Sequence, residues 1–216
     1  MLIVQYVALA ALLCCIALFT KYFAKLIRLG KPKDYSQASG SVSKGVLYAN
    51  TGAMLPQNKE SAYMHLPSYA IGIIFHLGTF LSLLIFVLSF FTFFNDFLTL
   101  YPIVSWIATG CLGISAICGI SLFIKRIFNS RLRILSNPDD FISNALTTLF
   151  HIVTLLYLLF QPQPYILTLY YIEAAILLIY MPLGKLHHVM YYFFARYHLG
   201  FFYGRRNVWP PQKAGK

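Results

Sequence analysis

Long runs of apolar residues, separated by short polar, aromatic or Pro-rich breaks, dominate the sequence. Each run reaches the roughly 20 residues that a helix needs to cross the hydrocarbon core of a bilayer. The first run has no basic segment before it and no small-residue cleavage site after it, so we expect a retained span rather than a cleaved signal peptide. The pattern predicts five membrane-spanning helices, at about residues 2–23, 66–91, 103–124, 142–160 and 164–194.

Composition agrees with this pattern, because 59% hydrophobic and 11% charged residues in a chain of 216 exclude a soluble domain. We predict an all-α membrane protein, a single integral domain over residues 1–216 that forms a bundle of five helices. The four cysteines lie within apolar runs and show no CxxC spacing, so we expect small packing residues rather than a metal site or disulfides. They are Cys14, Cys15, Cys111 and Cys118.

The net charge of +11 would suggest nucleic acid as the partner of a soluble chain, but here it follows the predicted loops. Every lysine and arginine falls on one side of the predicted membrane, whereas the loop around Asn95 and the turn 161–164 contain none. Basic loops stay in the cytoplasm. We therefore predict a multi-pass protein of the inner (cytoplasmic) membrane, with the N-terminus outside and the C-terminus inside.

Two segments on the inner side lie outside the predicted spans, the loop 24–64 and the tail 195–216. Neither has the apolar content to fold alone, so we expect each on the membrane lipid or against a partner. For residues 31–47 a solvated loop is the better interpretation. The tail interleaves aromatic residues with arginines over 197–211, which suits both interfacial anchoring and partner docking, and both interpretations stay open.

Few ionisable side chains lie inside the predicted spans, and burying such groups in hydrocarbon is costly unless each has a partner. A single histidine of this kind is commonly hydrogen-bonded across helices. Several together favour a functional site. The candidates are His76, His151, Glu173, His187 and His188.

His76 and His188 are predicted to lie at similar depth on antiparallel helices. His76 lies about ten residues into its span and His188 about seven from the end of its own, which at about 1.5 Å per residue differs by roughly one turn. Two imidazoles on opposite faces of a haem iron form an electron-transfer centre. Gly72 and Gly184, each four residues before a histidine, would let the porphyrin approach the helix.

Lys185 and Arg196 lie toward the inner surface, where they could meet the haem propionates. Snorkelling of both side chains to the lipid headgroups is the alternative. His187 remains a second candidate for the ligand on its span.

His151 and Glu173 each lie about nine residues from the turn 161–164, on adjacent helices, so we expect similar depth. Facing each other, they would form an acid–imidazole pair that exchanges protons at a quinone site. A structural hydrogen bond between them is the alternative. Ligation of haem by His151, opposite His76 or His187, is a third.

Three stretches together resemble the gamma subunit of respiratory nitrate reductase, its haem b membrane subunit. They are Leu122–Arg133 followed by Asp139 and Asp140, the motif Phe75-His-Leu-Gly78, and Pro182 with Lys185-Leu-x-His188. The same stretches resemble the membrane cytochromes of heterodisulfide-reductase-like and sulfite-reduction-associated complexes. The resemblance covers most of the second to fifth spans.

This resemblance implies a quinone-linked cytochrome b that exchanges electrons with an iron–sulfur subunit on the cytoplasmic face. His76 and His188 fall on the ligands of the family's inner haem. The family's outer haem has ligands that would fall at Phe86 and near Tyr170, which cannot replace imidazole. One haem b is therefore expected, as part of an electron-transfer subunit rather than a complete enzyme.

Two further histidines could form a second haem site at the inner end. His65 precedes His76 by eleven residues and His198 follows His187 by eleven, which returns each to nearly the same helical face. Surface or docking histidines are the alternative, because exposed sites without an apolar pocket bind haem poorly.

A non-redox protein is the other class of function that the sequence allows, either a membrane anchor or a small transporter with an intramembrane His/Glu network. Transporters commonly contain internal repeats, and none is evident here. An intramembrane hydrolase would want a nucleophile–base pair or an HExxH motif, and the sequence shows neither.

Overall fold

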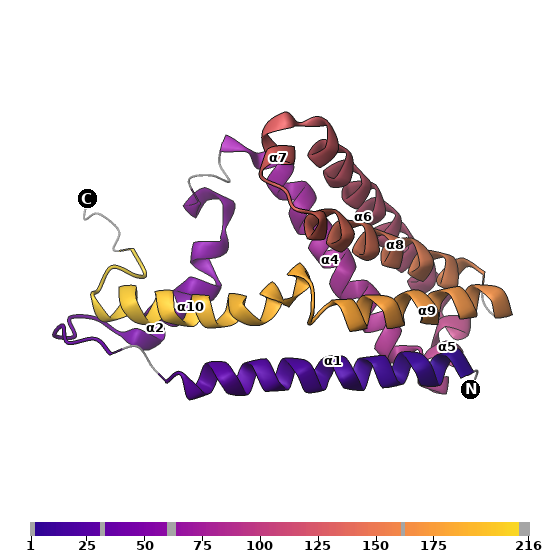
Figure 1. Cartoon of the computed structure of the whole chain (residues 1–216), viewed down its shortest axis with the longest axis horizontal. Coiled ribbons are helices and arrows are strands. Elements are labelled where there is room, and N and C mark those ends of the chain that lie inside the picture. Colours follow the sequence, from indigo (N-terminus) through magenta and orange to yellow (C-terminus); the bar gives the residue numbers. More distant parts are fainter. Residues whose placement is uncertain (1–2, 31–32, 60–63, 161–162, 212–216) are drawn as a thin grey trace. The chain divides into compact units, whose positions relative to one another are not determined.

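Helices account for all the regular structure in the residues that this computed structural model describes, which are 3–30, 33–59, 64–160 and 163–211. The α-helices are α1 (Ile3–Arg28), α2 (Val42–Asn50), α4 (Leu66–Leu88), α5 (Thr92–Leu100), α6 (Pro102–Phe128), α7 (Ser130–Ile134), α8 (Pro138–Leu159), α9 (Pro164–Tyr180) and α10 (His188–Arg205) (Figure 1). Short 3₁₀ turns are η1 (Gly52–Met54), η2 (Pro56–Asn58) and η3 (Lys185–His187). The predicted all-α class is confirmed for this part of the chain.

The chain divides into two compact units. Unit 1 comprises residues 1–17 and 67–186, and unit 2 comprises residues 18–66 and 187–216. In unit 1, α6 and α8 pack along each other and α8 packs on α9 (Figure 1). In unit 2, α2 packs on α10.

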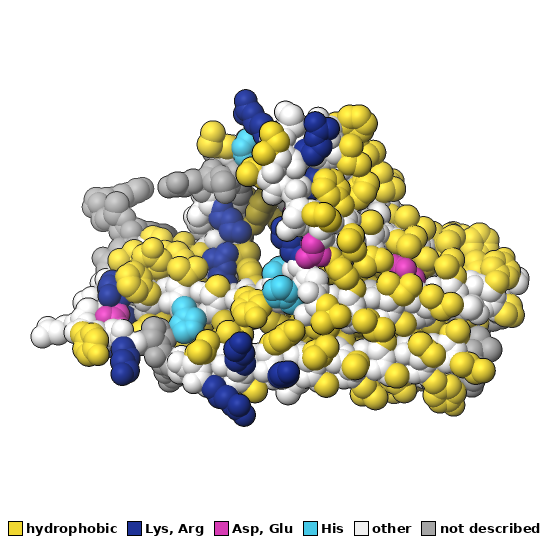
Figure 2. Space-filling model, viewed as in Figure 1, with side chains coloured by type: hydrophobic (Ala, Val, Ile, Leu, Met, Phe, Trp, Pro, Cys, Tyr) yellow, Lys and Arg dark blue, Asp and Glu magenta, His cyan; other side chains and the backbone are white. Residues whose placement is uncertain are grey.

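Four of the helices, α1, α4, α6 and α8, are long and apolar enough to cross a membrane. A fifth span results if α9 and α10 are counted as one broken span. Large apolar side chains such as Leu77, Trp106 and Ile117 are exposed, and hydrophobic side chains cover much of the visible surface of unit 1 (Figure 2). Exposed apolar area on this scale needs lipid around it. These helices indicate a multi-pass membrane protein.

Proline and capping residues set where the unit 1 helices begin. Pro102, Pro138 and Pro164 each stand in the first turn of a helix, where the missing N–H is no loss. At the start of α8, the Asn137 side chain accepts from the Asp140 N–H at 3.0 Å, and the Asp140 carboxylate accepts from the Asn137 N–H at 3.1 Å. This reciprocal capping box fixes the first turn of α8.

The predicted fifth span, 164–194, is wrong as one continuous helix. α9 ends at Tyr180, residues 181–184 form turns, and α10 begins at His188. Pro182 lacks the N–H that would continue the helical hydrogen bonds, and the Leu183 and Gly184 N–H groups both donate to the Tyr180 carbonyl. The apolar run continues through this break, so hydropathy alone does not reveal it.

Close approach of α2 and α10 depends on glycines in unit 2. A Cβ at Gly45 would meet backbone atoms of Gly200 and Gly204, and one at Gly200 would meet the backbone of Val46. Small residues at facing positions let two helix backbones approach this closely. The α2–α10 pair is thus the core of unit 2.

A loop before α2 is fastened to the end of α10. The Arg206 guanidinium forms two contacts with the Asp34 carboxylate, at 2.7 and 3.2 Å, and the Ser39 and Gly40 N–H groups donate to the Arg205 carbonyl. Hydrogen bonds from the Ser36 hydroxyl and N–H, together with Arg206, lower the pKa of Asp34 to about 2. The carboxylate is therefore charged at neutral pH.

The loop 24–64 and the tail 195–216 were expected to lie on the membrane or against a partner. Their described parts pack against each other through α2 and α10. Before α2 the loop is largely exposed, as at Tyr35 and Ser39, which agrees with the predicted solvated loop, although the Ser39 and Gly40 N–H groups also donate to the Arg205 carbonyl. The apolar content of the two segments did not predict that α2 and α10 pack together, because backbone contacts at glycines, rather than large apolar side chains, bring the two helices together.

Candidate functional site

His76 lies on α4 with its imidazole exposed at the surface of unit 1. Its Nδ1 lies 2.6 Å from the Gly72 carbonyl oxygen. A carbonyl can only accept, so Nδ1 carries the proton and Nε2 presents its lone pair. This is the tautomer that a metal-ligating histidine adopts when its second nitrogen is held by a backbone carbonyl.

The His76 imidazole is accessible from outside unit 1. A Cβ built on Gly72 would meet nothing within 4 Å, so the helix surface one turn before His76 is open. An exposed imidazole of fixed tautomer beside a bare stretch of helix leaves room for a flat macrocycle. The expectation that Gly72 lets a porphyrin approach the helix stays a prediction.

Gly184 does not leave an open helix surface beside His188, as was expected. It lies in the turn between α9 and α10 rather than on one helix with His188, and the ring of Tyr180 occupies the place where its Cβ would be. The break also removes the depth count for His188, which assumed a helix through residue 194. His188 is exposed at the first position of α10 and His187 is half-buried at its N-cap. Their assignment as ligands stays a prediction.

Lys185 is paired with a carboxylate in unit 1. Its ammonium and the Arg126 guanidinium both contact Asp140 Oδ1, the latter at 3.2 Å. Asp140 is buried, and its carboxylate also caps α8 through Asn137. Lys185 was expected to contact a haem propionate. In this structure it contacts Asp140 at the start of α8, and Arg126 at the end of α6 contacts the same carboxylate. The sequence showed Asp140 only as part of a motif.

Replacing Asp140 with asparagine should destabilise unit 1. The Asp140→Asn change keeps an oxygen for the Asn137 cap but removes the charge between two cations. We expect the free energy of unfolding to fall by about 1–2 kcal/mol, since both cations are partly exposed and screened. Thermal unfolding of the purified chain measures this, and Asp139→Asn, one residue earlier, is the control. Equal loss in both variants would contradict a role for the ion pairs.

His151 is fully buried, with hydrogen bonds at both ring nitrogens. The Thr79 hydroxyl donates to the Phe75 carbonyl at 2.9 Å and so accepts from His151 Nε2–H at 3.0 Å. Nδ1 is 3.2 Å from the Ser115 hydroxyl, whose single hydrogen can be donated either to Nδ1 or to the Ile74 carbonyl, also at 3.2 Å. With neither nitrogen available, ligation of haem by His151 does not fit this structure. Its hydroxyl partners on two other helices were missed, because a sequence shows depth but not which way a side chain points.

Glu173 is buried on α9, yet it does not form the expected pair with His151. Its Oε1 has no hydrogen-bond partner among the described residues, while the two nitrogens of His151 are bonded to hydroxyls. Equal distance from the outer turn therefore did not make the two groups neighbours in hydrogen bonding. An unpartnered buried carboxyl oxygen costs stability and calls for a proton or a ligand.

Aromatic rings fill the interior at the two positions where the resemblance would require outer-haem ligands. Phe86 and Tyr170 are both fully buried, with ring centroids 6.2 Å apart. Tyr170 also stacks on Tyr157 at 4.5 Å and lies parallel to Phe150. Close-packed rings of this kind are core packing.

The remaining candidates lie in unit 2. His65 is exposed just before α4, and His198 is half-buried on α10 beside Tyr197. The Arg196 guanidinium lies 5.5 Å from the centroid of the Tyr192 ring, a cation–π arrangement. The second haem at His65 and His198 and the propionate role of Arg196 stay predictions.

Among the residues that the structure describes, no group of three or more His, Cys, Asp or Glu side chains could hold a metal ion. A haem held by two histidines requires only two such side chains. Comparisons with family models, curated proteins and solved structures found no match.

Proposed function

We propose that this chain is the membrane-anchoring cytochrome b subunit of a respiratory oxidoreductase complex. It would pass electrons between a membrane quinone and an iron–sulfur protein on the cytoplasmic face. The observation that carries the proposal is the hydrogen bond from His76 Nδ1 to the Gly72 carbonyl, which directs Nε2 outward beside an open helix surface. The resemblance to the nitrate reductase gamma subunit suggests that the partner is an iron–sulfur protein.

In this proposal His76 and His188 hold haem b, which supplies one-electron transfer when bound. The Gly72 carbonyl fixes the orientation of the His76 ring and raises the basicity of Nε2. Asp140 holds Lys185 in the turn that leads to His188. His187 is the second choice for the ligand on that segment.

Quinone chemistry also needs a group that takes up or releases protons, because two protons move with the two electrons. We assign this role to Glu173, whose Oε1 has no described partner. His151 would then position Thr79 and Ser115 rather than exchange the proton itself.

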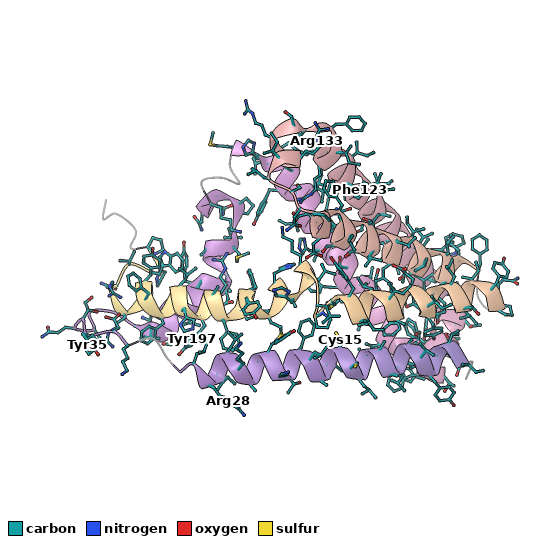
Figure 3. All side chains as sticks on the ribbon, in the orientation of Figure 1. Cys15, Arg28, Tyr35, Phe123, Arg133 and Tyr197 are labelled. Carbon is teal, nitrogen blue, oxygen red and sulfur yellow. The ribbon has the colours of Figure 1, made fainter. Side chains whose placement is uncertain are left out.

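The cytoplasmic side is assigned from charge. Arg131 and Arg133 lie on α7, which follows α6 and precedes α8 in the chain. Figure 3 labels Arg133, and the exposed side chains of Phe128, Ile134 and Leu135 flank the two arginines in the sequence. Arginine with apolar side chains is a common composition of docking surfaces. By the positive-inside rule this face, with the C-terminus, lies in the cytoplasm and the N-terminus outside.

A non-redox anchor is the second candidate, favoured by one observation. Every nitrogen of His151 is satisfied by neighbouring hydroxyls, as expected of a purely structural polar network.

Quinol-driven reduction separates the two. The purified chain in lipid vesicles should show reduction of its haem when a reduced quinol analogue is added, and Glu173→Gln should slow that reduction while leaving haem content unchanged. Tyr165→Phe, on the exposed side of α9, is the control. Haem that dithionite reduces but quinol does not would contradict the quinone role.

A further inference from the structure

A pocket of about 780 Å³ lies within unit 2, between the loop that precedes α2 and one face of α10. Ala195, Leu199 and Phe202 form its apolar side, at positions i, i+4 and i+7 of the helix. The loop contributes Tyr35, which Figure 3 labels near the end of α10. Pockets of this volume hold ligands of several hundred daltons.

The charged groups at this pocket are predominantly basic. Lys33, His198 and Arg206 line it together with a single carboxylate, Asp34. Asp34 is matched by Arg206 through two contacts, at 2.7 and 3.2 Å, so these two charges offset each other. The Lys33 ammonium remains to meet an anionic ligand, and the His198 imidazole can donate an N–H to it.

We propose that this pocket binds one anionic phospholipid. The phosphate would lie at Lys33 and His198, and the first part of an acyl chain would lie along Ala195, Leu199 and Phe202. A free phosphate ion has no apolar part that could contact this face of α10, whereas a lipid has one. A chain with several membrane-spanning helices has such lipids beside it, and basic pockets next to apolar helices recognise their headgroups.

The proposal does not depend on haem or quinone, because unit 2 contains every residue of the pocket. It gives His198 a role other than that of a second haem ligand. The α2–α10 pair would then hold the pocket in shape, because the loop that precedes α2 is bonded to the end of α10 through Asp34 and the Arg205 carbonyl.

Native mass spectrometry of the full chain, released from nanodiscs of phosphatidylcholine and phosphatidylglycerol, tests this. Wild type should retain one phosphatidylglycerol in preference to phosphatidylcholine. Lys33→Gln should weaken retention about fivefold, as removal of one charge predicts. Ala195→Trp, which fills the pocket without altering charge, should abolish it. Lys44→Gln and Leu47→Trp, on the exposed side of α2, are the matched controls and should retain lipid as wild type does.

Equal retention of the two lipids would overturn the proposal, as would undiminished phosphatidylglycerol on Ala195→Trp. Inorganic phosphate is added as a competitor and should leave the lipid bound; displacement would assign the site to a free anion. Displacement by a poly-glutamate peptide would assign it to an acidic protein segment instead. Unchanged protease resistance of residues 33–59 in each variant shows that unit 2 remains folded, because the loop and α2 are held against α10.

Discussion

Gly45→Leu should separate α2 from α10 and disrupt unit 2. Even a Cβ at this position overlaps backbone atoms of Gly200 and Gly204, which cannot rotate away as a flexible side chain can. Overpacking of a close interface costs about 1–3 kcal/mol when side chains can adjust. Because the obstacle here is backbone, we expect a loss of at least about 3 kcal/mol and undocking of the helix.

Trp209 reports on this undocking. Its ring lies 5.5 Å from Tyr48 of α2 and 4.7 Å from Tyr203 of α10. In a Trp106→Phe background Trp209 is the remaining tryptophan of the chain, since the sequence has two. Gly45→Leu should shift its emission to longer wavelength and make residues 33–59 sensitive to protease. Gly110→Leu on α6, where a Cβ meets nothing within 4 Å, should do neither. Wild-type emission and protease resistance in Gly45→Leu would refute the glycine interface.

His76→Ala and His188→Ala should each remove haem from the purified chain, whereas His187→Ala should not. Losing one of two axial imidazoles leaves the iron with a single protein ligand, and we expect haem per chain to fall at least about tenfold. The pyridine haemochrome assay against protein concentration gives this ratio.

A second variant guards against simple misfolding. Gly72→Leu leaves the His76 imidazole and its carbonyl partner in place but fills the open helix surface beside them. It should lower haem content without lowering the unfolding temperature of the haem-free chain, since bound haem itself stabilises the folded state. If His187→Ala loses haem and His188→Ala keeps it, the ligand has been assigned to the wrong neighbour.

Hydropathy was sufficient to predict four of the spans, because a bilayer imposes length and apolarity on each helix independently of its neighbours. It failed at Pro182, where the apolar run continues but the backbone hydrogen bonds do not. Because the helix is broken there, Gly184 and His188 do not share a helix face as was predicted. A proline in the middle of a predicted span was the available signal.

The direction in which each buried side chain points also could not be predicted from the sequence. Residue counts placed His151 and Glu173 at similar depth, but depth does not say which neighbour each one faces. His151 faces Thr79 and Ser115 on other helices, and those short hydroxyl side chains are too common to single out in a sequence. The docking of α2 on α10 was missed for a related reason, since Gly45 contributes only backbone.

A reduced-minus-oxidised visible spectrum of the purified wild type tests most directly whether the chain is a haem b protein. With dithionite as reductant, the account predicts the absorption bands of a low-spin haem b and about one haem per chain. A folded, monodisperse preparation from haem-replete cells that shows no such bands would contradict it.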